Sequence, residues 1–469
     1  MTERIRHARV SPRRHESPDA KTPDNRLALL DQAFFEGHRA AGQREVMQVG
    51  WLYDRAVDPD ELKRFHDNLG YGLLGRLIER SPLPFGRHRW VTDPQPAQIE
   101  IATRARTRAE LVDWFDECTQ VPVDPELGPG WRLSVLPLTN GGTAISLVLS
   151  HYVIDGIGGA IAVTEAILGL PRDLGYPPQR SRNRLRALAE DTTASLRDGL
   201  AIIRAMTLAV KGARSRVEDA ARAKAARPIA ELGSEADVSV TMPSVWIRLN
   251  LGEWVARAEA LGGTASTLAA AFTARLDMHM GRCHSDAVGV PVLLVVNDRT
   301  ENDVRAIAVS FVRAYINPSG VTEDLRQARN SIKYAVTAHR GTPDHSAQLA
   351  ALAPFTPKRA WRLMIESALS DPEHPAVCSN LGDTGSAAIR PDGTLCDDVF
   401  ARGASQHLSA RWLERIGSQL HLFYGTSVEI DRVGIYISGY QPNTATNRSE
   451  LRGHVERTLA EFGLLGQID

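Results

Sequence analysis

The chain of 469 residues has almost balanced charge, with 55 Lys and Arg residues against 56 Asp and Glu residues. Its length allows two or three cores of ordinary size and excludes a small disulfide-held scaffold. The net charge of −1 gives no general reason to expect nucleic acid as a partner. We expect free thiols, as in a reduced cytoplasmic protein, because no CxxC pair occurs among Cys118, Cys283, Cys378 and Cys396.

Residues 1–24 are charged and contain prolines, without the apolar run of a signal peptide, and we expect a disordered tail there. No later stretch approaches the roughly 18 to 20 uninterrupted apolar residues that a membrane-spanning helix needs. We therefore expect a cytoplasmic protein whose membrane contact, if it has one, is peripheral and on the inner face.

The first half, residues 25–170, opens with a strand and a helix. Residues 45–55 alternate apolar and polar side chains, which is the pattern of a half-buried strand. Asp58 and Pro59 then supply an N-cap and a first helical residue, and apolar residues follow at helical spacing through Leu73. A strand followed by a helix indicates an α/β arrangement.

A hairpin is expected around Asn140-Gly141-Gly142, because these residues accept the positive φ of a tight turn. Strand-like runs flank the turn at 130–139 and 143–153. The second run ends in "HYVIDG", residues 151–156, and a helix is expected over 159–168. The hairpin thus delivers a histidine and an aspartate to its exit.

Residues 171–235 are rich in Arg, Lys and Ala and predict an amphipathic helical tether between two halves. One interpretation is a helix packed on the domain surface. Another is a reversible contact of 180–227 with an anionic membrane, because arginines flank the apolar stripe. That stripe comprises Leu185, Leu188, Leu196, Leu200, Ile203 and Val210.

The second half, residues 236–469, alternates strands and helices again. Strands are expected at 238–251, 287–296, 306–316, 375–382, 418–425 and 433–440, and helices at 264–280, 322–340 and 448–464. The predicted fold class is α/β, with two subdomains of mixed sheets joined by the helical tether.

His151 lies at the end of an apolar strand face that includes Ile145, Leu147 and Leu149. Partial burial there favours neutral imidazole, the form that accepts a proton near neutral pH. The structural alternative is a strand-end histidine followed by an Asp-Gly turn. Spacing alone leaves both interpretations open.

Asp155 and Gly156 complete the motif. Asp155 could orient the imidazole directly, as in a catalytic triad, or it could pair with an arginine, since a buried carboxylate needs a partner. Gly156 permits backbone geometry that a Cβ would forbid. These arrangements assign different roles to the carboxylate.

We expect no bound metal. His151 and Asp155 have no second histidine or cysteine nearby in the sequence to complete a ligand set. His279, Cys283 and His284 lack a recognised ligand spacing and are typical of a solvated helix end. The glycine turns form no phosphate-binding loop, so nothing indicates ATP or NAD.

"HYVIDG" resembles the HxxxDG motif of the chloramphenicol acetyltransferase-like superfamily, which includes condensation domains and the wax ester synthase/diacylglycerol acyltransferase family. "LALLDQAFF" at 27–35 resembles the opening segment of wax ester synthases. "VPVLLVVNDR" at 290–299, followed by "AIAVSFVRAYI", resembles a second-half segment of condensation domains, and "CSNLGD" at 378–383 resembles their SNxxG-type stretch. The likeness extends from about residue 27 to the C-terminus and is nearest to the wax ester synthase family.

The resemblance implies an acyltransferase with two such subdomains and an active-site tunnel at their interface. His151 would be the general base that deprotonates a hydroxyl or amine acceptor as it attacks a thioester, with no acyl-enzyme. Arg299 would form a salt bridge with Asp155, and Gly156 would let the thioester approach the backbone. The donor would be acyl-CoA or an acyl carrier protein, as a co-substrate rather than a bound cofactor, and the acceptor a small molecule or lipid.

Three polar residues are predicted to line the substrate channel: Ser150, Ser379 and Asn380. Ser379 and Asn380 could stabilise an oxyanion, or could be a structural strand-end pair. Ser150 departs from the family pattern, in which a second histidine precedes the base. Because Ser150 lies on the opposite strand face from His151, the missing histidine should not remove the base. The departure from the family motif argues against a long-chain lipid substrate. A catalytically silent binding or scaffold module of a biosynthetic complex is the alternative function.

Overall fold

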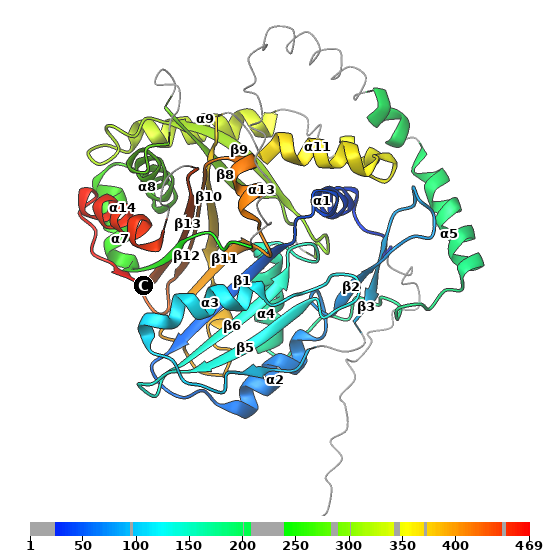
Figure 1. Ribbon diagram of the computed structural model, residues 1–469, viewed down its shortest axis with the longest axis horizontal. Helices are drawn as coiled ribbons and strands as arrows, with labels where there is room; N and C mark the ends of the chain where they lie inside the picture. Colours follow the sequence, from blue (N-terminus) through cyan, green and yellow to red (C-terminus); the bar gives the residue numbers. More distant parts are fainter. Residues whose placement is uncertain are drawn as a thin grey trace, which may run out of the picture.

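The computed structural model describes residues 24–93, 97–199, 201–207, 239–282, 289–300, 302–341, 348–369, 373–442 and 447–469. In these ranges the chain forms two mixed sheets with helices packed against them (Figure 1). The predicted α/β class with mixed sheets is confirmed. The predicted disordered tail lies, up to residue 23, outside the described residues.

The first sheet has the strand order β11-β1-β6-β5-β4. Its members are β1 (Glu45–Tyr53), β4 (Glu100–Ile101), β5 (Trp131–Pro137), β6 (Thr143–Ser150) and β11 (Asp398–Ser405). Helices α2 (Pro59–Leu69) and α4 (Gly156–Ile167) bury apolar side chains on one face, and α3 (Leu111–Gln120) does so on the other. The β5–β6 hairpin turns at Gly141, with φ of 86°, as the Asn-Gly-Gly sequence predicts.

The second sheet has the order β14-β7-β13-β12-β10-β8-β9. Its strands are β7 (Ser244–Asn250), β8 (Val290–Asn297), β9 (Val309–Ile316), β10 (Ala376–Asp383), β12 (Gln419–Ser427), β13 (Arg432–Tyr440) and β14 (Gln467–Ile468). Helices α7 (Leu251–Ala260), α8 (Ala265–His279) and α14 (Arg448–Glu461) share its largest core (Figure 1). Helix α9 (Arg326–Gly341) follows β9.

Several shorter elements connect the two sheets. Helix α1 (Leu29–Ala40) lies beside α11 (Lys358–Leu369) and η2 (Ala350–Phe355) (Figure 1). The others are β2 (Arg76–Glu79), β3 (Arg89–Thr92), η1 (Arg108–Glu110), α12 (Gly385–Ala388) and α13 (Ala410–Ile416).

One strand of the second half belongs to the first sheet. β11 pairs antiparallel with β1 over eight residue pairs, from Glu45↔Ser405 to Leu52↔Asp398. The sequence pattern did not predict this strand. It makes β1 a central strand. The two faces of β1 are buried by separate cores, one with Met47 and Trp51 and the other with Val46 and Leu52, so β1 is not half-buried as its alternation predicted.

The helix expected from Pro59 through Leu73 is shorter than predicted. Asp58 caps it by accepting hydrogen bonds from the backbone N–H groups of Asp60 and Glu61, as its sequence position predicts. It ends at Leu69, and Gly72 follows with φ of 64°, a conformation that an L-residue rarely adopts.

The tether is helical at α5 (Arg184–Arg197) and again at 201–207, while Leu200 and residues 208–235 lie outside the described residues. Several of its large apolar side chains are exposed. Leu185 and Leu196 are 80% and 77% exposed, whereas the small Ala187 and Ala205 are buried. The helix nevertheless contacts the domain, since Asp191 accepts from Oγ of Ser81 at 2.5 Å and Asp198 pairs with Arg87 at 3.3 Å. The surface-packed helix and the membrane contact both stay predictions.

Within the described residues, no helix is both long and apolar enough to cross a membrane. Cys118, Cys378 and Cys396 are buried free thiols, as expected, and Cys283 lies outside the described residues.

Candidate active site

The HxxxDG motif occupies the turn between β6 and α4. β6 ends at Ser150, earlier than predicted, and the backbone N–H of His151 donates to the carbonyl of Glu45 on β1 at 3.0 Å. Asp155 is the N-cap of α4, and Gly156 is its first residue. The histidine therefore sits in the tight turn directly after the strand.

The imidazole of His151 is held in one tautomer. Its Nδ1 lies 2.9 Å from the carbonyl oxygen of Ile154, and because a carbonyl only accepts, Nδ1 carries the hydrogen. Neutral imidazole then has its lone pair on Nε2. Burial lowers the pKa of His151, and the nearby charge of Asp155 partly opposes this. The residue is half-buried, and its imidazole is therefore a neutral proton acceptor at neutral pH.

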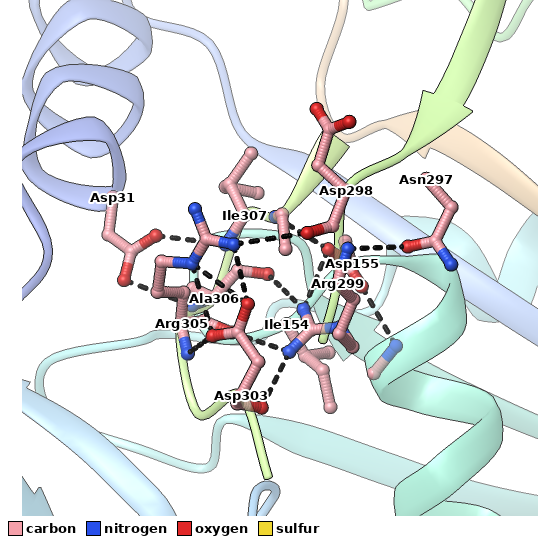
Figure 2. Close-up of polar contacts among 12 residues, drawn as sticks. Asp31, Ile154, Asp155, Asn297, Asp298, Arg299, Asp303, Arg305, Ala306 and Ile307 are labelled. Carbon is pink, nitrogen blue, oxygen red and sulfur yellow. Dashed lines mark hydrogen bonds and ion pairs between the residues drawn. The ribbon is translucent and has the colours of Figure 1, made fainter. Parts of the chain in front are cut away.

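Whereas the imidazole of His151 contacts the carbonyl of Ile154, Asp155 binds an arginine (Figure 2). Its Oδ2 accepts from Nη2 of Arg299 at 2.7 Å and from the backbone N–H of Ala308 at 2.8 Å. Its Oδ1 accepts from the N–H of Gly158 at 2.8 Å. Both charged side chains are at most 2% exposed, so the pair is a buried ion pair with additional hydrogen bonds.

Arg299 also organises the segment between β8 and β9. Its Nη1 donates to the carbonyls of Asp303 at 2.9 Å and Arg305 at 3.1 Å, so the segment curls around the guanidinium (Figure 2). This segment, described at residues 298–300 and 302–308, comes from the second half of the chain but lies against the motif of the first half. The structure thus brings together Asp155 and Arg299, two of the predicted site residues, 144 positions apart.

A second carboxylate, which sequence reasoning missed, binds the same segment. Asp31 on α1 is buried and accepts the backbone N–H groups of Ala306 and Ile307, each at 2.9 Å (Figure 2). Burial raises the pKa of Asp31 although both hydrogen bonds lower it. The available signal was a single aspartate within the apolar run "LALLDQAFF".

Arg76, a buried arginine that sequence reasoning also missed, binds the motif turn. Nη2 of Arg76 donates to the carbonyl of Val153 at 2.7 Å, and Nη1 donates to that of Val304 at 2.6 Å. The guanidinium lies 4.0 Å from the centre of the Trp90 ring. The sequence placed Arg76 just beyond a predicted helix, with no indication that it turns inward.

The other predicted residues lie on β10. Ser379 is buried, and Asn380 is exposed, its Nδ2 donating to Oγ of Ser266 at 3.1 Å. The next residue, Leu381, makes the contact with the motif, because a Cβ placed on Gly156 would lie 3.1 Å from its Cδ2. The second sheet thus reaches the start of α4 through Leu381.

Glu45, next to His151 across the β1–β6 pair, is a further residue that the sequence did not single out. Ser405 donates to its carboxylate at 2.8 Å, and burial raises the pKa of Glu45 to about 7. It lines a cavity of about 240 Å³ together with Ser150 and Tyr152.

His151 lines none of four cavities in the described part of the chain, and the predicted tunnel to it stays a prediction. The described residues also contain no cluster of three or more His, Cys, Asp or Glu side chains that could hold a metal. His279 contacts Thr458 and Glu461, while Cys283 and His284 lie outside the described residues.

Comparison with known proteins finds no matching family model. Two curated proteins from two strains of Mycobacterium tuberculosis, each named "Putative diacyglycerol O-acyltransferase", are 27% identical over 176 residues. This stretch is 35% of the chain and 34% of each relative, so the chain spans about a third of the length of the curated relatives it matches.

Solved structures match over nearly the whole chain. The wax ester synthase/diacylglycerol acyltransferase from Marinobacter aquaeolei VT8 has a TM-score of 0.52 at 14% identity, covering 93% of this chain and 98% of that one. The first condensation domain of the CDA synthetase has a TM-score of 0.54 at 13% identity, covering 95% and 100%. The starter condensation domain of rhizomide synthetase, in complex with C8-CoA and Leu-SNAC, has a TM-score of 0.50 at 14% identity, covering 93% of each chain. The two mixed sheets are those of the condensation-domain fold.

Proposed function

We propose that this chain is an acyltransferase that moves an acyl group from a thioester to a hydroxyl or amine acceptor. The observation that carries the proposal is the neutral imidazole of His151, fixed through Nδ1 at the turn where the first sheet meets the second. The names of the curated relatives and the shared condensation-domain fold support this reaction class. The two relatives' names refer to diacylglycerol, but the match covers a third of their length, so the acceptor stays open.

In the proposed reaction, Nε2 of His151 takes the proton as the acceptor oxygen or nitrogen attacks the thioester carbonyl. The new carbon–oxygen or carbon–nitrogen bond forms, the carbon–sulfur bond breaks, and the leaving thiolate receives the proton back from the imidazolium. No acyl-enzyme forms. The nearby charge of Asp155 stabilises the transient imidazolium, since it favours the protonated ring.

Asp155, Arg299 and Gly156 have supporting roles in this proposal. The ion pair holds the start of α4, so that the motif turn keeps its shape while the imidazole changes charge. Gly156 lets Leu381 of β10 pack closely on the start of α4, because a Cβ there would lie only 3.1 Å from Cδ2 of Leu381. Approach of the thioester to the backbone of Gly156 belongs to the same proposal. Ser379 and Asn380 would form the facing polar wall, close to the developing oxyanion.

The donor is proposed to be a thioester with a pantetheine arm, either acyl-CoA or an acylated carrier protein. A neighbour of the same fold was solved with C8-CoA, which supports this donor class. Peripheral contact of the tether with a membrane belongs to the same proposal and is supported by the exposed Leu185 and Leu196.

Replacing His151 by Ala tests the proposal. We expect acyl transfer to fall by about 10² to 10⁴-fold, the usual contribution of a general base, with the melting temperature retained. In the unchanged protein, kcat/KM with an alcohol acceptor should stay level as the pH falls to 6.5 and decline only below it, because burial lowers the pKa of His151 and only the neutral ring accepts a proton.

The matched control is His454→Ala on α14, which removes an imidazole far from the motif and should leave activity unchanged. Intact-protein mass spectrometry after incubation with acyl-CoAs and acylated carrier proteins should show no acyl adduct. Undiminished transfer by His151→Ala, or a stable acyl-enzyme, would reject the proposed mechanism.

A further inference from the structure

A cavity of about 430 Å³ lies where α1 approaches α11, and its lining is strongly cationic. The only carboxylate among the residues that line it is Glu36, which Nε2 of His88 contacts at 2.7 Å. Cations from three separate segments therefore line one cavity, although the chain as a whole has a net charge of −1. These cations are Arg39, Arg80, Lys358, Arg359 and Arg362.

The positive charge of this cationic cavity is only partly neutralised. Arg39 and Arg80 share one carboxylate, that of Glu126. Burial lowers the pKa of Arg39, and the neighbouring charge of Arg80 lowers it further. No ion pair with a carboxylate within the described ranges involves the three cations of α11. An anion in the cavity would therefore meet several guanidinium groups that have hydrogen-bond donors to offer.

The start of α11 adds to this positive potential. The helix begins at Lys358 and has no acidic residue in its first turn. The N-terminal end of a helix carries partial positive charge and unpaired N–H groups, so Lys358 and Arg359 are unfavourably placed there unless an anion is bound. The twelve-residue helix thus presents its dipole and two side-chain cations to the same cavity.

A second cavity lies beside the first and is lined by two residues that flank His151 in the chain. Arg39 lines both, and the far side of the second cavity is lined by Ser150 and Tyr152, the neighbours of His151 in the chain. On α1, Arg39 lies five residues from Phe34, or about 7.5 Å along the helix axis. The ring centre of Phe34 is 5.5 Å from that of His151. A pantetheine arm can span this distance.

We propose that the cationic cavity binds the phosphate-bearing end of a pantetheinyl thioester, with the arm running past Arg39 toward Ser150. The inference rests on the proposed acyl transfer and names the part of the substrate that the cavity recognises. Guanidinium groups bind phosphate oxygens in pairs, which suits a ligand with several phosphate groups. Free CoA and the prosthetic group of a carrier protein share this chemistry, and the number of cations favours CoA.

Calorimetry on the full chain with three probes tests the inference: CoA, 4′-phosphopantetheine and pantetheine. We expect CoA to bind at least tenfold more tightly than pantetheine, with an affinity that falls as salt is raised. Tighter binding of CoA than of 4′-phosphopantetheine would identify free CoA as the source. Equal binding of these two, both above pantetheine, would identify a carrier-protein arm. Equal affinity for all three, or no binding, would overturn the inference.

The variant pair Arg359→Ala/Arg362→Ala should reduce CoA affinity at least tenfold and leave pantetheine affinity unchanged. Its matched control, Arg186→Ala/Arg457→Ala, removes two exposed helical arginines elsewhere and should bind CoA normally. The charge-keeping pair Arg359→Lys/Arg362→Lys should lose less affinity than the alanine pair, because it keeps the positive charge but not the paired N–H donors. Normal CoA binding by the alanine pair would contradict the assignment.

Kinetics separate this inference from the proposed function. With acyl-CoA, the alanine pair should raise KM and leave kcat nearly unchanged, whereas His151→Ala should lose kcat and still bind CoA with normal affinity. If no thioester supports transfer but CoA still binds more tightly than pantetheine, the proposed function fails and the phosphate site stands. If transfer occurs and the three probes bind with equal affinity, the proposed function stands and the phosphate site is rejected.

Discussion

The group proposed to accept the proton and the group that anchors the motif are different residues of the same turn. Nδ1 of His151 is held by the carbonyl of Ile154, while Asp155 is occupied by Arg299 and by backbone N–H groups. The carboxylate therefore anchors the turn through contacts that do not involve the imidazole. The charge of Asp155 acts on the imidazole without direct contact. The hydrogen bonds of the carboxylate hold the shape of the turn.

Removing the carboxylate at Asp155 should destabilise the fold. Asp155→Ala leaves Arg299 charged, buried and without its anion, and we expect a loss of roughly 3 to 5 kcal/mol in the free energy of unfolding, measured by urea denaturation. The double variant Asp155→Ala/Arg299→Leu should recover part of this loss because the stranded charge is gone. A single variant as stable as the unchanged protein would show that the ion pair does not hold the turn.

The carboxyl of Glu45 should make stability depend on pH. Its pKa is raised from 4.5 to about 7 by burial, so the folded state keeps a proton that the unfolded state has already released. The contribution is present below pH 4.5 and is lost as the pH rises toward 7, by at most roughly 3 kcal/mol. The free energy of unfolding should therefore decrease more between pH 5 and pH 8 in the unchanged protein than in Glu45→Gln. An equal decrease in the two proteins would contradict this prediction.

Among the structural elements, the segment between β8 and β9 joins the two halves. It is bound by a carboxylate from α1 and by another from the start of α4, so its backbone N–H groups at 306–308 donate to side chains of the first half. Arg76 adds a hydrogen bond to the carbonyl of Val304. A displacement of this segment would disturb the motif turn, because Asp155 of the turn binds the N–H of Ala308 in the segment. Arg76 likewise links the two, since it donates to the carbonyls of Val153 and Val304.

Asp31→Ala should loosen this segment. The N–H groups of Ala306 and Ile307 would lose their acceptor, at about 1 to 3 kcal/mol for each buried donor. We expect faster hydrogen exchange in peptides covering 302–309, with smaller changes in α8. The control is Asp58→Ala, which removes the N-cap of α2 and should leave exchange in 302–309 unchanged. Unaltered exchange in Asp31→Ala would show that the segment is held by other contacts.

Over the whole molecule, the two sheets are not two independent domains. β11 returns from the second half to pair with β1, and Trp246, Phe400 and Tyr436 pack in the same core as α3. Asp116 of α3 binds Arg402 and Arg448 at 2.7 Å each. The division at residue 236 therefore describes the order of elements along the chain better than their packing.

A cut in the tether should leave the halves together. When residues 1–220 and 221–469 are produced as separate chains in one cell, we expect them to co-purify at equal amounts, because β11 completes the first sheet. A variant of the second piece with Phe400→Asp should weaken this association by placing a charge in the shared core. Independent purification of two folded pieces would contradict the shared sheet.

Local sequence pattern was sufficient for features set by a few neighbouring residues. The Asn140-Gly141-Gly142 turn, the Asp58 cap and most strand positions follow from backbone preferences and hydrophobic spacing, which act within about ten residues. The motif could be placed at the end of β6 for the same reason. The fold class with two mixed sheets followed from the alternation of strands and helices together with the family resemblance.

Other features depend on contacts between distant segments, which local pattern does not encode. The alternation in β1 predicted an exposed face, and that face is buried because Val46 and Leu52 pack in a core shared with α3 and with side chains of the second half. Asp31 and Arg76 carry ordinary local signals, and their partners lie more than two hundred residues away. The cationic cavity combines three such segments. The physical reason is that burial, ion pairing and electrostatic potential are properties of the assembled surface, and they arise only when the folded chain brings those residues together.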